Sequence, residues 1–296
     1  MTEKRGISYN AAIFTNGYLF DREMALKMKR YHVRMAQISL DGPPEIHNKR
    51  RPLKTGGGTF DRILQNIKDI SDVMPILLRF NLDKTNANPD ILSRLLDELE
   101  KKEIPKESNI NVDLAQIQPF TAACVEFAKA KGFDRRDYGK MIVKLAPLII
   151  ERGYYFADYR LAPVPACCPS TWTHSIIVAP NGDIYRCLTT IGDKREIIGN
   201  IFQSTMHLTR NLAKWLAWNP FERKQCQECN ILPLCMGGDG CPYPDVAAKG
   251  YVRSKIRCSP LKFNMKEMIE LVYEQRKKRK NTIQKTGRNR FEHIPS

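Results

Sequence analysis

The sequence predicts an α/β fold in which a partial parallel sheet with its helices is followed by a small cysteine-rich domain. In the first half, apolar runs of strand-forming residues alternate with segments of helical period, which is the pattern of βαβ units. In the second half, prolines and clustered cysteines replace that alternation from residue 163 onward. At 296 residues the chain is long enough for about two domains.

The predicted parallel strands are apolar runs, and they lie at Ala11–Phe14, Arg34–Leu40, Ile76–Leu82 and Asn111–Gln118. Apolar residues at helical spacing lie between and after them. One helix is expected over Phe60–Ile70 with Thr59 as its cap. A second begins after Asn88 and Pro89, and a third covers Asp134–Glu151.

Polar residues cluster where the predicted strands end. In parallel α/β sheets, ligands bind beyond the carboxyl ends of the strands, so these positions could build a small-molecule site. The same residue types also form ordinary turns and caps, and both interpretations stay open. The residues are Thr15, Asn16 and Gly17 after the first strand, Ser39, Asp41 and Gly42 after the second, and Asn81, Asp83 and Asn86 after the third.

The second half is expected to begin with a β-hairpin. Ser175–Ala179 and Asp183–Cys187 are apolar segments of strand type on either side of Pro180, Asn181 and Gly182. An Asn-Gly pair between two such segments is a strong hairpin signal. The returning strand would then end at Cys187. A helix-like stretch with Trp215 and Trp218 follows.

Seven of the nine cysteines form one pattern that predicts two metal sites. Thiolates are soft ligands, and four of them at short spacings hold either zinc or an iron-sulfur cluster, so both metals stay open. In a reducing compartment, clustered cysteines favour metal over disulfides. Cys124, alone on a helical stretch, is expected to be an ordinary buried cysteine. The seven are Cys168, Cys187, Cys226, Cys229, Cys235, Cys241 and Cys258.

The bulk composition predicts a cytoplasmic protein with a basic tail. No apolar stretch is long enough to span a bilayer, and the first ten residues lack a signal-peptide core. The formal net charge is +16, and the segment from Arg276 to Arg290 contributes much of this excess. Such a tail either binds nucleic acid or an acidic peptide, or is a solvated helix end.

Several motifs together resemble a known family. The stretches IFTNGYLF, QISLDGPPEIHNKRRPLKTGGGTFDRILQNI and LLRFNLDKTN resemble the catalytic barrel of radical S-adenosylmethionine enzymes. The cysteine tract resembles their C-terminal SPASM domain. The resemblance implies a partial (β/α) radical SAM barrel over residues 1–162, a SPASM auxiliary iron-sulfur domain over 163–262, and a C-terminal helix and basic tail over 263–296.

The resemblance also implies cofactors and roles. Enzymes of this family use a reduced [4Fe-4S] cluster to cleave S-adenosylmethionine into a radical that abstracts hydrogen from a peptide or protein. Ser39, Arg79 and Asn81 would face S-adenosylmethionine. A small electron-donor protein would be a partner. The SPASM domain would hold two auxiliary [4Fe-4S] clusters. The ligands of the first would be Cys168, Cys187 and Cys241, and Cys167 would either replace Cys168 or be a fourth ligand. The ligands of the second would be Cys226, Cys229, Cys235 and Cys258.

Three departures from the family pattern modify these expectations. The chain has no cysteine before Cys124, so the C-x3-C-x2-C motif of the catalytic cluster is absent. S-adenosylmethionine and a third cluster are therefore expected only in a full-length form, and this chain alone is expected to be inactive. Five residues separate Cys235 from Cys241, where the family has three. Leu188 stands where sulfatase-maturing members carry a catalytic aspartate, which favours another peptide maturation, such as thioether or carbon-carbon crosslinking.

Three hypotheses follow for the function. The first is a radical S-adenosylmethionine protein that modifies a peptide or protein, with its auxiliary clusters present. The second is a zinc-ribbon protein that binds nucleic acid through the basic tail. The third is a non-catalytic scaffold that keeps the barrel and docks a substrate peptide or an intact paralogue.

Overall fold

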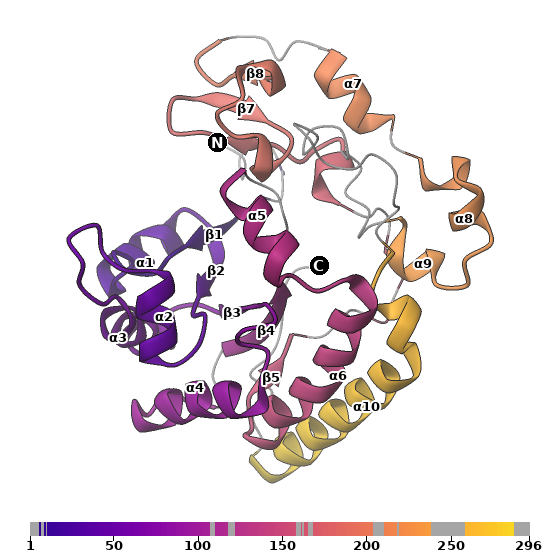
Figure 1. Ribbon diagram of the computed structural model, residues 1–296. Coiled ribbons are helices and arrows are strands. Elements are labelled where there is room, and N and C mark those ends of the chain that lie inside the picture. The colour runs from indigo at the N-terminus through magenta and orange to yellow at the C-terminus, as the bar shows by residue number, and fades with distance from the viewer. Residues whose placement is uncertain are drawn as a thin grey trace.

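The computed structural model describes residues 6, 9, 11–106, 110–117, 122–157, 161, 163–164, 168–203, 210–217, 219–237 and 258–286. The first half contains a five-stranded, fully parallel sheet with the strands in chain order (Figure 1). The four predicted strands are confirmed within two residues at their ends, and a short fifth strand joins them. The strands are β1 (Ala11–Thr15), β2 (Val33–Ser39), β3 (Ile76–Leu82), β4 (Ile110–Gln116) and β5 (Tyr155–Phe156).

Helices connect the strands, as a parallel sheet in chain order requires. The three predicted helices are confirmed as α3, α4 and α6. A further helix, α5, covers the helical stretch around Cys124, and α1 and α2 lie in segments for which no helix was predicted. The six are α1 (Arg22–Arg30), α2 (Pro44–Arg50), α3 (Phe60–Ile70), α4 (Pro89–Lys101), α5 (Ala122–Lys131) and α6 (Arg135–Glu151).

The helix caps were predicted correctly in one case and wrongly in another. The Asn88 side chain accepts a hydrogen bond from the Asp90 N–H, as an N-cap should. Thr59 does not cap α3, because its own backbone is already helical and its hydroxyl donates to the Arg51 carbonyl. Asn48 of α2 takes over the role: its Oδ1 accepts from the N–H groups of Thr59 at 2.8 Å and Phe60 at 2.9 Å.

A continuous apolar core lies between the sheet and its helices. On β3, the side chains of Ile76, Leu78, Phe80 and Leu82 are fully buried, and they alternate with partly exposed neighbours. The predicted apolar stripes of the helices meet this face, although Met141 and Ile91 are only partly buried. The buried stripe residues include Ile63, Leu64, Ile67 and Ile70 of α3, Leu92, Leu95, Leu96 and Leu99 of α4, and Tyr138, Ile142, Leu145 and Ile149 of α6.

The second half contains a small antiparallel sheet of three strands, β6 (Ile177–Val178), β7 (Asp183–Tyr185) and β8 (Gly199–Asn200). The predicted hairpin is confirmed as the pair β6 and β7. Gly182 has φ +86°, and an added Cβ there would lie 2.6 Å from the Phe202 ring, so both conformation and space require glycine.

Short helices lead from this sheet to a long C-terminal helix, α10 (Leu261–Thr286), which begins close to the predicted position. The helix runs along α6 (Figure 1), and the Asn264 side chain donates to the Gly139 carbonyl at 3.0 Å. Gln275 hydrogen-bonds both the N–H and the carbonyl of Phe156 in β5. The short helices are η2 (Pro169–Thr171), η3 (Leu188–Thr190), η4 (Lys194–Glu196), α7 (Arg210–Leu216), η5 (Pro220–Glu222), α8 (Lys224–Gln227) and α9 (Leu232–Cys235).

These contacts join α10 to the parallel-sheet half, and the predicted three-part division at residues 162 and 262 stays a prediction. Trp215 is almost fully buried, whereas Trp218, Cys167 and Cys241 lie outside the described residues. Within the described ranges, none of the helices combines the length and the apolar character needed to cross a bilayer.

Candidate functional site

The face of the sheet opposite the apolar core is polar on three neighbouring strands. The predicted residue Ser39 of β2 is in register with Arg79 of β3, and Arg79 is in register with Asp113 of β4. Asn81 lies two residues beyond Arg79, and therefore on the same face of β3. The structure thus brings Ser39, Arg79 and Asn81 together, as expected from sequence.

The Arg79 guanidinium is at the centre of this polar face. It donates to Asn81 Oδ1 at 3.2 Å and to Gln37 Oε1 at 3.5 Å, and it lies 3.7 Å from an Asp113 carboxylate oxygen. Burial raises the pKa of Asp113, and the nearby Arg79 charge opposes that rise. Both side chains keep part of their surface exposed, so a cation and an acid are available to a ligand side by side.

Asn111 adds an unsatisfied acceptor to the polar face. Its position on β4, two residues before Asp113, places it on the same side of the sheet. Asn111 is only 4% exposed, and among the described residues its Oδ1 has no hydrogen-bond partner. A buried unpaired acceptor costs about 1–3 kcal/mol, so a ligand that donates a hydrogen bond here would recover that cost.

Sequence reasoning missed Gln37, Asn111 and Asp113 on this face. The signal was present in the segment INVDLAQ, where Asn111 and Asp113 alternate with apolar residues before the strand ends at Gln116. An acid in the middle of a buried strand is costly unless it has a partner or a function. The alternation therefore could have identified Asn111 and Asp113.

The polar residues beyond the strand ends have mainly a structural role. Asp41 pairs with Arg51 at 2.6 Å, and Asp83 pairs with Arg50 at 2.7 Å. The Asn86 side chain donates to the carbonyls of Asp41 and Asn81 and so ties the loops after β2 and β3 together. For Asp41, Asp83 and Asn86, the structure thus favours the loop interpretation.

His47 belongs to the same network and is fully buried. Its Nδ1 accepts from the Asp41 N–H at 3.2 Å, which leaves Nε2 to donate to the Thr59 hydroxyl at 3.1 Å. Burial lowers the pKa of His47 from 6.5 to about 4. The imidazole is therefore neutral at pH 7 and acts as a structural link between α2 and α3.

Four of the predicted metal ligands line one small pocket. Cys226 lies on α8, Cys235 ends α9 with Cys229 between these helices, and Cys258 precedes α10. Burial raises the pKa of Cys226, the Arg223 charge opposes that rise, and the other three thiols add to it. The structure therefore gathers all four residues predicted for the second auxiliary site.

The thiols share this pocket without converging on a single point. Within the described part of the chain, no three His, Cys, Asp or Glu side chains are arranged to hold one metal ion. A structural zinc ion needs four ligands at about 2.0–2.3 Å from one centre. An iron-sulfur cluster is bulkier, and its thiolates attach to separate irons. Four cysteines that line one pocket supply the number of thiolates that a [4Fe-4S] cluster needs.

The first auxiliary site is described only in part. Cys168 precedes η2, and its thiol lies 3.3 Å from the Ser170 hydroxyl. Cys187 follows β7, and its thiol lies 3.0 Å from the Thr189 hydroxyl. Both thiols are partly exposed. Since Cys241 and Cys167 lie outside the described residues, the structure does not test the full ligand set.

Comparisons with known proteins relate the parallel sheet to a family. Residues 6–86 match the Radical SAM superfamily. The Fe-coproporphyrin III synthase of Methanosarcina barkeri (strain Fusaro / DSM 804) is 36% identical over 97 residues, which are 32% of this chain and 23% of that protein. The matched segment thus spans about a quarter of this curated relative.

Solved structures resemble nearly the whole chain. Native anSMEcpe with bound AdoMet and the Cp18Cys peptide has a TM-score of 0.62 at 18% identity, covering 95% of this chain and 78% of that one. Native anSMEcpe with bound AdoMet also has a TM-score of 0.62, at 17% identity and the same coverage. At these identities the likeness shows the fold. The family match alone relates residues 6–86 to the radical SAM proteins.

Proposed function

We propose that the polar face of the parallel sheet contributes to an S-adenosylmethionine site and that the cysteine-bearing half holds two auxiliary [4Fe-4S] clusters. The chain would act within a radical SAM protein that modifies a peptide or protein. The observation that carries the proposal is the single pocket lined by Cys226, Cys229, Cys235 and Cys258. The family match over residues 6–86 supports S-adenosylmethionine and [4Fe-4S] as the cofactors.

The polar face has the chemistry to bind the methionine part of S-adenosylmethionine. That part carries a carboxylate and an ammonium group, which complement a guanidinium and a carboxylate. Arg79 would bind the carboxylate, and Asp113 would accept from the ammonium group. Ser39 and the unpaired Oδ1 of Asn111 would provide neutral hydrogen bonds on the same face.

The cysteines would hold the two auxiliary clusters as the SPASM pattern implies. Cys226, Cys229, Cys235 and Cys258 would bind one of them, with Cys226 the most buried thiol of the set. Cys168, Cys187 and Cys241 would bind the other, and Cys167 is a candidate for a remaining position. When bound, such clusters supply one-electron redox chemistry.

The proposed substrate is a peptide or protein. Two neighbouring structures of the same fold contain a peptide together with AdoMet. Leu188 follows Cys187 directly and is 53% exposed, so a side chain that cannot accept a proton faces solvent there. We therefore propose a maturation that needs no base at this position, such as a crosslink. The protein would work in the cytoplasm with a small electron-donor protein.

Metal analysis tests the cluster proposal. Protein reconstituted without oxygen is expected to be brown and to contain iron and acid-labile sulfide in equal amounts, corresponding to two clusters. Cys226→Ser should remove the iron of one cluster and leave the other. Cys124→Ser is the matched control, because this cysteine lies outside the metal-binding pattern, and its iron content should equal that of the wild type. Colourless protein with stoichiometric zinc would contradict the proposal.

Ligand titration tests the proposed S-adenosylmethionine site. Arg79→Gln removes a charge-assisted hydrogen bond worth about 1.5–3 kcal/mol, so the dissociation constant should rise about 10- to 100-fold. Arg94→Gln is the control, since Arg94 is a half-exposed arginine that pairs with Glu45 away from the polar face. An affinity that is equal in both variants would count against this site.

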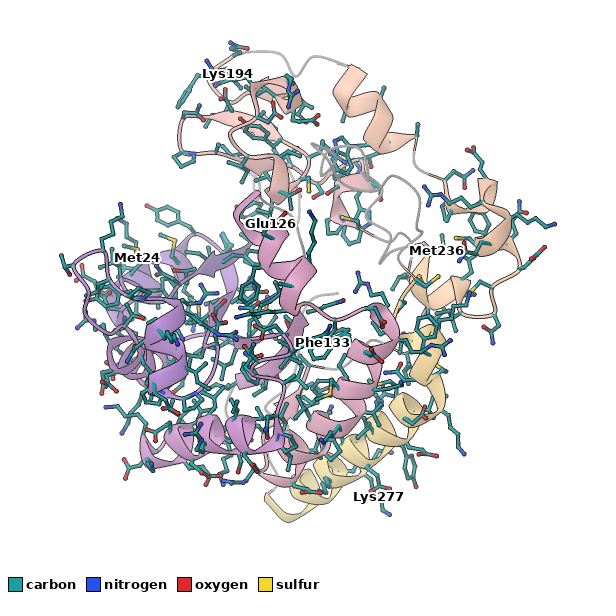
Figure 2. The ribbon with its side chains drawn as sticks, viewed as in Figure 1. Met24, Glu126, Phe133, Lys194, Met236 and Lys277 are labelled. Atoms are coloured by element: carbon teal, nitrogen blue, oxygen red, sulfur yellow. The ribbon has the colours of Figure 1, made fainter. Side chains whose placement is uncertain are left out.

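The nucleic-acid alternative has its own test. The basic residues 276–280 lie on α10, whereas Arg288 and Arg290 lie outside the described residues. Figure 2 shows Lys277 near the opposite end of that helix from Met236, which follows α9. Binding through this helix would weaken steeply with salt, because phosphate contacts release counterions. A gel-shift titration at low salt is expected to show no complex. A salt-sensitive complex that Lys277→Gln weakens would support the alternative.

A further inference from the structure

Arg186 is a buried cation beside the proposed first auxiliary site. It is 1% exposed and directly precedes Cys187 at the end of β7. Its Nε and Nη2 donate to the Ser170 carbonyl at 3.0 and 2.7 Å. Nη1 also donates to the Ser175 carbonyl, and Nη2 to the Trp172 carbonyl. All three guanidinium nitrogens therefore hold the backbone of the segment that follows Cys168.

This arrangement links the two proposed ligands through one side chain. The residue next to Cys187 in the chain holds the turn that begins at Cys168, in which the Cys168 carbonyl accepts hydrogen bonds from the Thr171 N–H and hydroxyl. The planar guanidinium suits this task, because its donors project in a fixed fork. A lysine would carry the same charge without that fork.

The charge of Arg186 is not neutralised by a carboxylate in the described part of the chain. The hydrogen-bond partners found there are main-chain carbonyls. Taking a cation out of water is costly unless a negative charge lies nearby. A thiolate-ligated cluster would supply that negative charge.

We propose that Arg186 is a positioning residue for the first auxiliary cluster. It clamps the Cys168 turn to the end of β7, just before Cys187, and it compensates the negative charge of the bound cluster. The inference rests on the proposed role of Cys168 and Cys187 as cluster ligands. Cluster potentials respond to net charge and hydrogen bonding around the sulfurs. A buried cation favours the more negative, reduced state, so Arg186 raises the midpoint potential of this cluster.

The test uses the full chain loaded with clusters in the absence of oxygen. Iron content and an EPR-monitored reductive titration are measured for wild type, Arg186→Met and Arg186→Lys. Arg186→Met removes charge and donors, so the first cluster should lose occupancy or titrate at a lower potential. Arg186→Lys keeps the charge but loses the fork, so its occupancy should fall while its remaining cluster titrates closer to wild type. The second cluster should stay unchanged in both.

A matched control separates this role from general damage to the module. Arg195 lies on η4, is 69% exposed and pairs with Asp193. In Arg195→Met, both clusters should remain as in wild type. If Arg186→Met proves too unstable to load, Arg186→Lys alone decides, through the occupancy and EPR signature of the first cluster.

The outcomes are distinct. Unchanged iron, potential and EPR signature of the first cluster in both Arg186 variants would overturn the inference, as would equal loss of both clusters. Wild-type protein without iron would instead overturn the proposed function itself, before Arg186 is tested.

Discussion

The parallel-sheet half and the three-stranded sheet differ in how much apolar surface each buries. The first half has a continuous core that runs through β2, β3, β4 and the helices. Around the small sheet, the apolar cluster of the described residues consists of Ile184, Ile198 and Leu212. Small domains with so little core usually need a metal or a disulfide. We therefore expect the parallel sheet to fold on its own core, and the small sheet to depend on the metal that its cysteines are proposed to bind.

The two proposed cluster sites differ in the same way. Cys229 and Cys235 pack against the large core, which also includes Ile231 and Leu261 from the neighbouring elements. Cys168 and Cys187 instead flank the small sheet, where Arg186 and its carbonyl partners supply much of the hydrogen bonding. We therefore expect the second proposed site to rest on the scaffold of the sheet half, and the first proposed site to depend more on the cluster that it would bind.

The largest expected effect comes from removing the metal. Chelation of iron should abolish amide protection over residues 183–200, because the small sheet then loses its main constraint. Protection over β3 and α4 should remain, since the described buried residues of their core include no cysteine and Cys229 and Cys235 only pack against it. Hydrogen exchange read by mass spectrometry before and after chelation measures both. Equal protection of the small sheet before and after chelation would contradict its expected dependence on metal.

A truncation in each core should act differently. Leu78→Ala, at a fully buried position of β3, is expected to lower the free energy of unfolding of the sheet half by about 2–5 kcal/mol. Ile198→Ala, also fully buried, should mainly lower the iron content of the first cluster. Urea titration and iron analysis measure the two effects. Leu19→Ala, at a position 78% exposed, is the control and should alter neither.

The free energy of unfolding of the sheet half should depend on pH, because the buried histidine His47 lies in that half. The pKa of His47 is lowered from 6.5 to about 4 in the folded protein. Between these values the unfolded chain binds a proton that the folded chain does not, so stability is complete above pH 6.5 and falls as the pH drops toward 4. The loss should reach about 3 kcal/mol.

Urea titrations of wild type and His47→Gln between pH 7 and 4.5 measure this contribution. The variant should be less stable at pH 7 and should lose less stability on acidification. His174→Gln, at an exposed position near β6, is the control and should follow the wild type. Parallel curves for wild type and His47→Gln would rule out this contribution.

The smallest effect concerns a helix cap. Asn88→Ala removes the side-chain acceptor for the Asp90 N–H and should destabilise the sheet half by about 1 kcal/mol. Asn88→Asp restores an acceptor and should recover most of that loss. The cluster content should not change in either variant. A loss of iron in Asn88→Ala would show that the two halves are more tightly coupled than their cores suggest.

Much of the fold could be predicted because it depends on local patterns. The apolar runs identified β1 to β4, and the three-four spacing together with Asn88 and Pro89 identified α4. The helix α2 was missed because it is short and its sequence, PEIHNKR, has almost no apolar stripe. The cap of α3 was assigned wrongly because its acceptor, Asn48, comes from another helix.

The residues of the candidate sites could likewise be predicted only in part. The resemblance to the SPASM pattern grouped Cys226, Cys229, Cys235 and Cys258, whereas Cys258 is too far from the other three in the chain for spacing to include it. The partners of Arg79 could not be predicted, since Gln37 and Asp113 come from neighbouring strands and meet it only through sheet register. Arg186 was also missed, because a single arginine before a cysteine has no local signal.

By itself, the sequence determined which segments become strands and helices, which cysteines could bind metal, and which family the motifs between Ile13 and Cys258 resemble. The tertiary structure decided that the three strands place a cation, an acid and an unpaired amide on one face, and that a buried guanidinium joins the segments of Cys168 and Cys187. The physical reason is that periodicity and spacing act between near neighbours in the chain, whereas register and burial arise only when distant segments pack.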